Sequence, residues 1–359
     1  MLTTGSITTE TFSAEMQFRK YQGLGNDFIL IDARKTESPP INPDQARLLC
    51  DRRFGVGADG LILALPAQGL GDVRMQIINA DGSEAEMCGN GVRCFARFLA
   101  DLDGATPSGS WRVETPAGII VPQLLADQQV SVDMGEPFLS PSAIPTSIDA
   151  GELLPEAWLE VAGEQLLVAA VGMGNPHAVV QVDDLDLIAF TELGSELEIH
   201  PAFPARTNVH FVQVISPNQL RMKVWERGAG ATLACGTGAC AVLVASHLRG
   251  ACAREADIEL PGGFLHILWD AANHLQMVGP AEFVFSGYWP LEENTELQFT
   301  KSIDCSTDCS QGCIDPENCP SASARANAMA VLDKFSLNQL VDLANESIEQ
   351  RTIKRIKGG

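Results

Sequence analysis

The sequence predicts an α/β fold of two similar lobes, each with strands around one buried helix. Short strand-like runs alternate with a few helices from Met16 to about Thr300. Glycine and proline are frequent, with 32 and 20 residues, which indicates many turns and disfavours a helical bundle. A Cys-Gly-x-Gly motif followed by a mostly apolar stretch occurs at Cys88 and again at Cys235. A chain of 359 residues is long enough for two such lobes.

Six short runs rich in apolar and β-branched residues are predicted to be strands. They are Phe28–Ala33, Leu61–Leu65, Val73–Asn79, Val209–Ile215, Leu220–Trp225 and Leu265–Trp269. The segment Pro43–Arg52 is expected to be a helix, because Asn42 is a good N-cap and proline suits the first helical position. Two further helices are expected after Cys88 and Cys235, where small residues precede apolar ones, as in buried helices.

The two cysteine motifs form an internal repeat. Cys88-Gly-Asn-Gly-Val-Arg-Cys94 matches Cys235-Gly-Thr-Gly-Ala-Cys240, and the leading cysteines are 147 positions apart (235 − 88). This distance fits one lobe of strands and a central helix, repeated once. Two such lobes facing each other would place both loops across one cleft. The other body cysteines are interpreted as small core residues: Cys50, Cys94, Cys240 and Cys252.

Composition excludes several classes of partner. The formal net charge of −22 argues against nucleic acid and against an anionic membrane surface, since both require clustered Lys and Arg. No apolar run approaches the roughly 18–20 residues that span a bilayer. Residues 1–15 contain neither Lys nor Arg and no apolar core of a signal peptide, so we expect a disordered leader. The expected location is the cytoplasm.

A Cys-Gly-x-Gly loop at a helix start offers two things to a ligand. Its glycines let the backbone turn tightly, so successive N–H groups point into one concavity that binds a carboxylate. The helix terminus also favours a thiolate, which lowers the pKa of a cysteine from about 8.5 towards neutrality. A lone loop is more often a structural cysteine at a turn. Two facing copies would hold one carboxylate between them, with a sulfur on each side of its α-carbon.

Such an arrangement is what an amino-acid racemase or epimerase needs. One thiolate removes the α-proton while the opposite thiol delivers a proton to the other face. N–H donors at the helix ends stabilise the carbanion that develops. Pyridoxal phosphate is the usual alternative electron sink. The chain has few lysines and no evident phosphate-binding arrangement, so no cofactor is inferred.

Longer stretches identify the family that the sequence resembles. They are GLGNDF (Gly23–Phe28), RRFGVGADG (Arg52–Gly60), NADGSEAEMCGNGVRC (Asn79–Cys94), GNPHAV (Gly174–Val179), RTNVHFV (Arg206–Val212) and WERGAGATLACGTGACA (Trp225–Ala241). In this order they closely resemble diaminopimelate epimerase, a pyridoxal-phosphate-independent isomerase of lysine and peptidoglycan precursor synthesis. The resemblance spans roughly Met16 to Thr300.

The resemblance implies two pseudo-symmetric lobes, each a central helix wrapped by mostly antiparallel strands, with the active site in the cleft between them. It places the first lobe at 16–134, with a return strand at about 285–300, and the second at 135–284. It implies that LL- and meso-2,6-diaminopimelate are interconverted, by a possible homodimer.

The family's site residues are carried over by matching positions. Cys88 would be the base towards the LL isomer and Cys235 the base towards the meso isomer, with His177 and Glu226 tuning their pKa values. Arg227 would bind the distal carboxylate through its planar fork. The remaining substrate contacts would come from Asn26, Asn79, Gly89, Asn90, Asn175, Asn208, Glu226, Gly236 and Thr237. No metal ligand is assigned. The chain departs from the family at Gly60, where some members place a substrate-contacting glutamine.

Two other interpretations remain open at this point. One keeps the two-thiol mechanism but changes the substrate, as in proline, hydroxyproline or histidine racemases. The other is a non-catalytic thiol-binding or metal-binding protein centred on a Cys-rich segment after Thr300. Purely structural roles are also open for single residues: Glu226 and Arg227 could form a local ion pair, and His177 could be a core histidine.

The segment 301–359 lies outside the family pattern. Its cysteines, Cys305, Cys309, Cys313 and Cys319, have neither zinc-ribbon nor common ferredoxin spacing. A redox-labile or disordered segment is therefore favoured over a metal site. The following stretch, 324–350, is expected to be a helix with an apolar face that could dock on the body or on another protein.

Truncation after Thr300 should leave epimerase activity intact, because the residues assigned to chemistry precede it. The measurement is turnover of the truncated and full-length chains, with circular dichroism to show that the shorter chain folds. A folded, inactive truncated protein would contradict the expectation.

Overall fold

The computed structural model describes residues 15–36, 38–85, 88–104, 108–149 and 151–290. The expected leader, apart from Glu15, lies outside the described residues, as do the four tail cysteines and the expected tail helix. The described part forms one compact unit, Glu15–Leu291.

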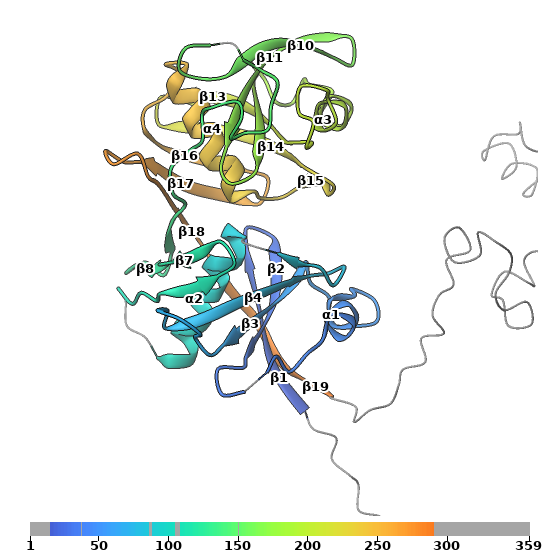
Figure 1. The fold of residues 1–359 in the computed structure, drawn as a ribbon, viewed down its shortest axis with the longest axis vertical. Coiled ribbons are helices and arrows are strands. Elements are labelled where there is room, and N and C mark those ends of the chain that lie inside the picture. The colour runs from blue at the N-terminus through green and yellow to red at the C-terminus, as the bar shows by residue number, and fades with distance from the viewer. Residues whose placement is uncertain (1–14, 37, 86–87, 105–107, 150, 291–359) are drawn as a thin grey trace, which may run out of the picture. The chain divides into compact units, whose positions relative to one another are not determined.

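One sheet has eight strands in the order β19-β1-β2-β3-β4-β6-β7, with β5 paired to β4 (Figure 1). Its strands are β1 (Glu15–Gly23), β2 (Asn26–Asp32), β3 (Gly60–Leu65), β4 (Val73–Asn79), β5 (Glu84–Ala85), β6 (Val113–Thr115), β7 (Gly118–Ile120) and β19 (Glu282–Pro290). β19 runs antiparallel to β1, with Trp289 opposite Met16. The end of the chain's described part therefore returns to its beginning, and the expected return strand coincides in part with β19.

The other sheet has eleven strands in the order β10-β11-β12-β13-β14-β16-β17-β18-β9-β8, with β15 paired to β14. Its strands are β8 (Gln123–Leu124), β9 (Val130–Asp133), β10 (Glu156–Val161), β11 (Glu164–Gly172), β12 (Pro176–Gln181), β13 (Asn208–Ser216), β14 (Gln219–Glu226), β15 (Gly230–Thr232), β16 (Glu255–Leu260), β17 (Gly263–Trp269) and β18 (Leu275–Gly279). β8 and β9, which precede residue 135, thus pair within the larger sheet.

The internal repeat extends to the strand topology. In the smaller sheet β1, β2, β3, β4, β5, β6 and β7 pair in the same sequence of directions as β11, β12, β13, β14, β15, β16 and β17 in the larger one. β2 is parallel to β3 as β12 is to β13, and β4 is parallel to β6 as β14 is to β16. The other pairs in each series are antiparallel. Two pseudo-symmetric halves with mostly antiparallel strands are confirmed.

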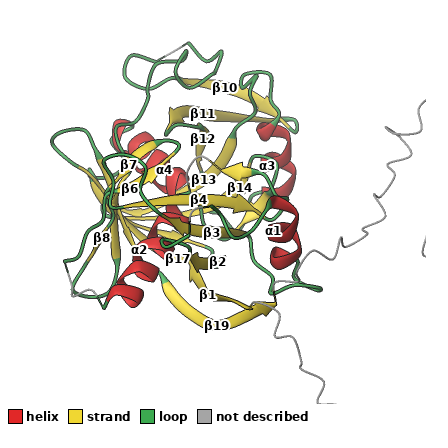
Figure 2. Ribbon diagram, turned by 60° about the horizontal axis from the view of Figure 1, so that its bottom comes forward, coloured by secondary structure: helices red, strands yellow, loops and turns green. Residues whose placement is uncertain are grey.

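Four helices accompany the strands: α1 (Pro43–Cys50), α2 (Gly89–Asp103), α3 (Phe190–Glu198) and α4 (Gly236–Leu248) (Figure 2). α1 has the expected start, since Asn42 and Gln45 form a reciprocal capping box and proline occupies the first turn. It ends two residues before the expected Arg52, because Asp51 takes an extended conformation. α2 and α4 begin directly after Cys88 and Cys235, as expected.

Three apolar clusters form the core. The largest joins α2 and α4 to the strand faces that cover them, and two smaller clusters lie where α1 and α3 pack on the opposite strand faces. β3 is therefore buried along its whole length, and ten residues of α4 are buried. This burial explains why α4 is apolar all round rather than amphipathic.

The six cysteines of the body are free thiols. Cys50, Cys94, Cys240 and Cys252 are buried in the apolar clusters, which confirms the interpretation of these four as core residues. Burial raises the pKa of Cys94 and of Cys240 to about 12. These thiols are therefore protonated at neutral pH and are inert packing groups.

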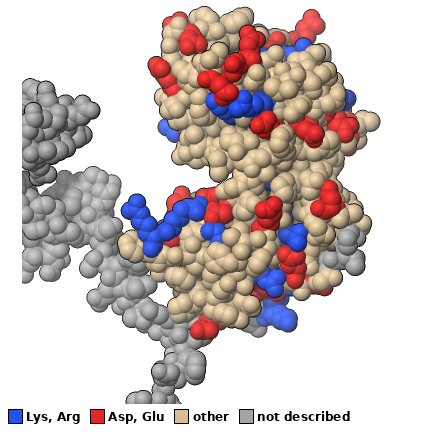
Figure 3. Space-filling view, turned by 180° about the vertical axis from the view of Figure 1, so that it is seen from behind, with Lys and Arg blue, Asp and Glu red and all other residues tan. Residues whose placement is uncertain are grey.

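Acidic and basic side chains are interspersed over the face shown in Figure 3. Among the described residues, no helix is both long and apolar enough to cross a membrane.

Candidate active site

The two motif cysteines occupy the same position in the two repeats. Cys88 is the N-cap of α2 with φ −142° and ψ 114°, and Cys235 is the N-cap of α4 with φ −137° and ψ 108°. Their backbones are therefore nearly superimposable. Each cysteine precedes the free N–H groups of a first helical turn, which is the part of a helix that attracts anions.

Glycine at the first helical position lets both loops approach one side chain. A Cβ added to Gly89 would lie 3.1 Å from Cε of Met277 on β18, and one added to Gly236 would lie 2.8 Å from Sδ of the same methionine. A larger residue at either position would crowd the end of the Met277 side chain. Both helix starts thus pack against one common neighbour.

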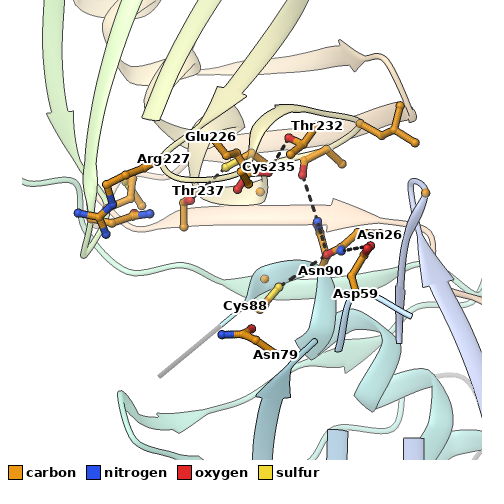
Figure 4. A pocket seen from close by; sticks show the side chains of 18 of the residues that line it. Asn26, Asp59, Asn79, Cys88, Asn90, Glu226, Arg227, Thr232, Cys235 and Thr237 are labelled. Carbon is orange, nitrogen blue, oxygen red and sulfur yellow. Dashed lines mark hydrogen bonds between the residues drawn. The ribbon is translucent and has the colours of Figure 1, made fainter. Parts of the chain in front are cut away.

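Both loops line one cleft with a volume of about 960 Å³. Eleven of the predicted site residues are among its lining: Asn26, Asn79, Cys88, Gly89, Asn90, Asn175, Glu226, Arg227, Cys235, Gly236 and Thr237. Figure 4 shows Cys88 and Cys235 on opposite sides of this space, one from each half of the repeat. The structure therefore brings together the two cysteines predicted to be the acid/base pair and most of the expected contact residues.

Cys88 is half-buried and held by its own helix. Its Sγ accepts a hydrogen bond from the Gly91 N–H at 3.4 Å and lies 3.9 Å from Oδ1 of Asn26. Loss of hydration raises the pKa of the Cys88 thiol, and the helix N–H groups oppose this rise.

Cys235 is buried, with 6% of its surface exposed, and has a different partner set. Its Sγ lies 3.5 Å from Oγ1 of Thr237. Burial raises the pKa of the Cys235 thiol well above its ordinary value, and the neighbouring Glu226 carboxylate adds to the rise. Glu226 accepts a 2.5 Å hydrogen bond from Oγ1 of Thr232. Burial also raises the pKa of Glu226, against the hydrogen bonds from Thr232 and Cys235.

The expected lowering of the thiol pKa values is wrong for the cleft as it stands. Helix N–H groups do lower both values, but desolvation is the larger effect at Cys88 and at Cys235. The sequence predicted the two helix starts. It did not predict that tertiary packing would remove water from the two sulfurs. Burial thus favours the thiol over the thiolate at both positions.

An amide network joins the two halves next to the thiols. Nδ2 of Asn90 donates to Oδ1 of Asn26 at 3.2 Å and to the carbonyl of Ala234 in the opposite half at 3.4 Å (Figure 4). Asn26 in turn donates to Oδ2 of Asp59 at 2.7 Å. These hydrogen bonds set the orientation of both amides. The Oδ1 of Asn90 has no hydrogen-bond partner among the described residues.

Arg227 is exposed at the cleft and has a guanidinium that is free of acidic partners. Its backbone N–H donates to Oδ1 of Asn208 at 3.0 Å, and its Nη1 donates to the carbonyl of Ala205 at 3.1 Å. Within the described ranges, no carboxylate lies within 4 Å of the Arg227 guanidinium. Arg227 does not form the local ion pair with Glu226 that was the structural alternative for these two residues. Its guanidinium is therefore available to an anionic ligand.

Two predicted residues lie behind the cleft wall. His177 is fully buried and Asn208 is 4% exposed, and neither lines the cleft. Nε2 of His177 is 2.8 Å from Oδ1 of Asn175, which does line it. The Asn208 side chain donates a hydrogen bond to the carbonyl of Pro176 and accepts one from the Arg227 N–H. Both residues therefore hydrogen-bond to residues that line the cleft, and neither reaches the cleft itself.

Sequence reasoning missed Asp59, Arg52 and Thr232, which also line the cleft. Nη2 of Arg52 is 2.6 Å from Asp59 and 2.7 Å from Asp27, so these charges brace the Asn26 side. Asp59 lies inside the RRFGVGADG stretch, and that position was the available signal. Gly60 is buried and does not line the cleft. A Cβ added at this position would lie 3.0 Å from the carbonyl oxygen of Ile78.

Chemically, the cleft offers a thiol on each side of a bound carbon and two helix N-termini for one carboxylate. Among the described residues, one set with metal-ligand character occurs, His177, His210 and Cys235, with ligand atoms within 4.8 Å of one another. The two imidazoles are hydrogen-bonded to each other at 2.8 Å. Arg227, Asn79 and Asn175 supply polar groups for the remainder of a ligand.

Comparison with known proteins agrees with this geometry. The family model described as diaminopimelate epimerase matches residues 18–139 and 169–284. A relative named diaminopimelate epimerase from Prochlorococcus marinus (strain MIT 9313) is 57% identical over 278 residues, covering 76% of this chain and 92% of the relative. Another with that name, from Synechocystis sp. (strain ATCC 27184 / PCC 6803 / Kazusa), is 56% identical over 274 residues, covering 76% and 98%.

Solved structures share the fold at low sequence identity. A probable proline racemase from Agrobacterium radiobacter K84, with bound carbonate, has a TM-score of 0.57 and 16% identity, covering 79% of this chain and 95% of its own. A phenazine biosynthesis protein of the PhzF family from Bacillus anthracis also has a TM-score of 0.57 and 16% identity, covering 77% and 100%. The two-lobed architecture is therefore common to several proteins with different names.

The raised thiol pKa predicts how Cys88 reacts with iodoacetamide. Only the thiolate is alkylated, so between pH 7 and 9 the rate should stay below that of an ordinary cysteine and climb about tenfold per pH unit. Peptide mass mapping after timed alkylation measures this rate, with the same peptide in the urea-unfolded chain as the reference. A rate that levels off below pH 8 would show a lowered pKa instead.

Proposed function

Because the chain belongs to the diaminopimelate epimerase family, we propose that it interconverts LL-2,6-diaminopimelate and meso-2,6-diaminopimelate without a cofactor. This is an isomerase reaction in lysine and peptidoglycan precursor synthesis. The observation that carries the proposal is the pair of thiols, Cys88 and Cys235, each capping a helix start on opposite sides of one cleft. A single carbon bound between them can lose a proton to one sulfur and gain a proton from the other.

The reaction balances with these two groups alone. In one direction the Cys88 thiolate takes the α-proton, so a C–H bond breaks and an S–H bond forms. The Cys235 thiol then gives its proton to the opposite face of the carbon and becomes the thiolate. In the reverse direction the two sulfurs exchange roles. The product differs only in configuration, and no electron acceptor is needed.

The carbanion is the costly intermediate, and the two helix N-termini lower its energy. We assign the reacting carboxylate to the N–H groups around Gly89, Asn90, Gly236 and Thr237, where both helix dipoles point at the same group. The negative charge that moves onto this carboxylate during proton removal is then met by fixed donors. Such donors need no reorganisation when the charge develops.

Glu226 is assigned to the tuning of Cys235 and to the substrate ammonium. Its carboxyl lies beside Cys235 in the cleft and has a raised pKa because it is buried (Figure 4). An ammonium bound next to Glu226 would favour its charged carboxylate and bring a positive charge to the thiols. We infer that the substrate itself supplies the charge that favours the thiolate, since the empty cleft does not.

The distal end of the substrate is assigned to Arg227, Asn79 and Asn175. The guanidinium of Arg227 can form two parallel hydrogen bonds to a carboxylate, which discriminates against amino acids without one. Asn26 and Asn208 orient this set through Asn90, Asp59 and the Arg227 backbone.

We also propose that the protein acts in the cytoplasm as a homodimer. The six free thiols of the body fit a reducing compartment. The edge strand β19 exposes apolar side chains, among them Phe283, Val284 and Tyr288, which a second copy would cover. Lobes at 16–134 and 135–284 remain the proposed division, and docking of the tail on the body or on another protein remains a prediction from sequence.

A homodimer should give twice the chain mass in sedimentation equilibrium at micromolar concentration. Phe283→Lys in β19 should weaken the association, because it places a charge in the apolar patch. A wild-type monomer at that concentration would overturn the dimer assignment.

The reaction is tested by deuterium incorporation from heavy water into the α-position of diaminopimelate. Wild-type protein should incorporate label, while Cys88→Ser and Cys235→Ser should lose about 10²–10⁴-fold in turnover, since a hydroxyl is far less acidic than a thiol. Cys252→Ala is the matched control, because that thiol lies outside the cleft and contacts the Leu243 carbonyl.

Three results would contradict the scheme. Near-normal turnover of either serine variant would refute two-base catalysis. Label in proline, hydroxyproline or histidine and none in diaminopimelate would replace the substrate while keeping the mechanism. No exchange with any amino acid would point to a thiol-binding or metal-binding protein.

A further inference from the structure

His210 is a buried imidazole that the assignment of site residues leaves without a role. It lies on β13, two residues after Asn208, and is fully buried. Its Nε2 is 2.8 Å from Nδ1 of His177, whose Nε2 is 2.8 Å from Oδ1 of Asn175. The three side chains therefore form one chain of hydrogen bonds from the interior to the cleft.

The direction of this chain follows from its end at Asn175. An amide oxygen only accepts, so Nε2 of His177 must carry the proton and donate. His177 and His210 both stay neutral, because burial lowers the pKa of His177 well below its ordinary value and lowers that of His210 to about 3. Nδ1 of a neutral His177 is then bare and accepts from Nε2–H of His210.

The opposite arrangement is less favourable. If the Asn175 amide turned its NH₂ group to His177, both imidazoles would take the other tautomer, and His210 would carry its proton on Nδ1. That atom is buried and has no hydrogen-bond partner among the residues that the structure describes. A buried N–H without an acceptor is rarer in proteins than a buried acceptor without a donor. The bare Nδ1 of His210 therefore selects the direction that ends at the amide oxygen of Asn175.

Packing leaves His210 little freedom to move. A Cβ added to Gly238, in the first turn of α4, would lie 2.3 Å from Cε1 of His210. The ring thus fills the space that glycine leaves open three residues after Cys235. Ring nitrogens of His177 and His210 also lie within 4.8 Å of the Cys235 sulfur. The imidazole pair is consequently clamped between β12, β13 and the start of α4.

We propose that His210 is a positioning residue for the substrate. It fixes His177 in the tautomer that holds the oxygen of Asn175, so the Asn175 NH₂ group is presented to the cleft as a donor for a substrate carboxylate. This deepens the proposed function and rests on it. His210 touches no substrate and acts through the two side chains in front of it.

The tautomer is measured directly by ¹⁵N–¹H correlation NMR of the wild-type protein with labelled histidine. Nδ1 of His177 should have the shift of a bare nitrogen and Nε2 that of a protonated one. A proton on Nδ1 of His177 would overturn the proposal. This measurement needs no substrate, so it stands or falls independently of the epimerase assignment.

Variants separate positioning from packing. His210→Leu removes the donor, and the KM for diaminopimelate should rise about tenfold, as expected for one misplaced hydrogen bond to a charged group, while kcat changes less than threefold. His210→Gln offers an amide donor in place of Nε2–H and should restore most of the KM. His247→Leu is the control, because His247 bonds the Cys252 carbonyl outside the cleft.

An unchanged KM in His210→Leu, or a loss that His210→Gln shares fully, would assign His210 a packing role only. Urea unfolding midpoints of all three variants identify effects that come from the fold. If His210→Leu does not fold, the wild-type NMR result and the glutamine variant still decide.

Discussion

The approach of two helix N-termini to one small space is the constraint on which the rest of the structure depends. Both α2 and α4 begin at the same cleft, and each is capped by a cysteine there. Gly89 and Gly236 allow this approach, because both pack against the end of the Met277 side chain. The repeated strand topology then carries each helix to its place, since the strands of either half cover its helix in the same order.

Burial of the two sulfurs between the helix starts disfavours their charged thiolate form. Packing the helices closely removes water from both sulfurs, and desolvation outweighs the help of the helix dipoles. In the proposed mechanism, the charge that favours a thiolate therefore arrives with the substrate, because burial raises the pKa of both thiols.

Local signals in the sequence predicted much of the fold. β4 has the predicted bounds, Val73–Asn79, because apolar and polar residues alternate from Val73 to Ile77 and turn residues follow at Asp81 and Gly82. The start of α1 follows from Asn42 and Pro43 alone. The two cysteine loops were identifiable because glycine spacing is a local property and the motif is repeated.

Features that depend on distant segments were not predictable in this way. Asp59 is an ordinary acidic residue until Asn26 and Arg52 converge on it. His210 lies in a buried strand, and only its pairing with the neighbouring β12 brings its ring within 2.8 Å of His177. The withdrawal of His177 and Asn208 behind the cleft wall likewise follows from tertiary packing.

The two halves match in backbone but not in the surroundings of their sulfurs. Cys88 is half-buried beside the neutral amide of Asn26, whereas Cys235 is buried beside the carboxyl of Glu226. Glu226 raises the pKa of both thiols, and among the named causes it ranks higher for Cys235 than for Cys88, so in the proposed mechanism the two directions begin at sulfurs with unequal surroundings. The ratio of the two kcat/KM values is fixed by the equilibrium between the isomers at every pH. The different surroundings of the two sulfurs can therefore change kcat and KM in each direction. The two kcat/KM values must still keep the same ratio.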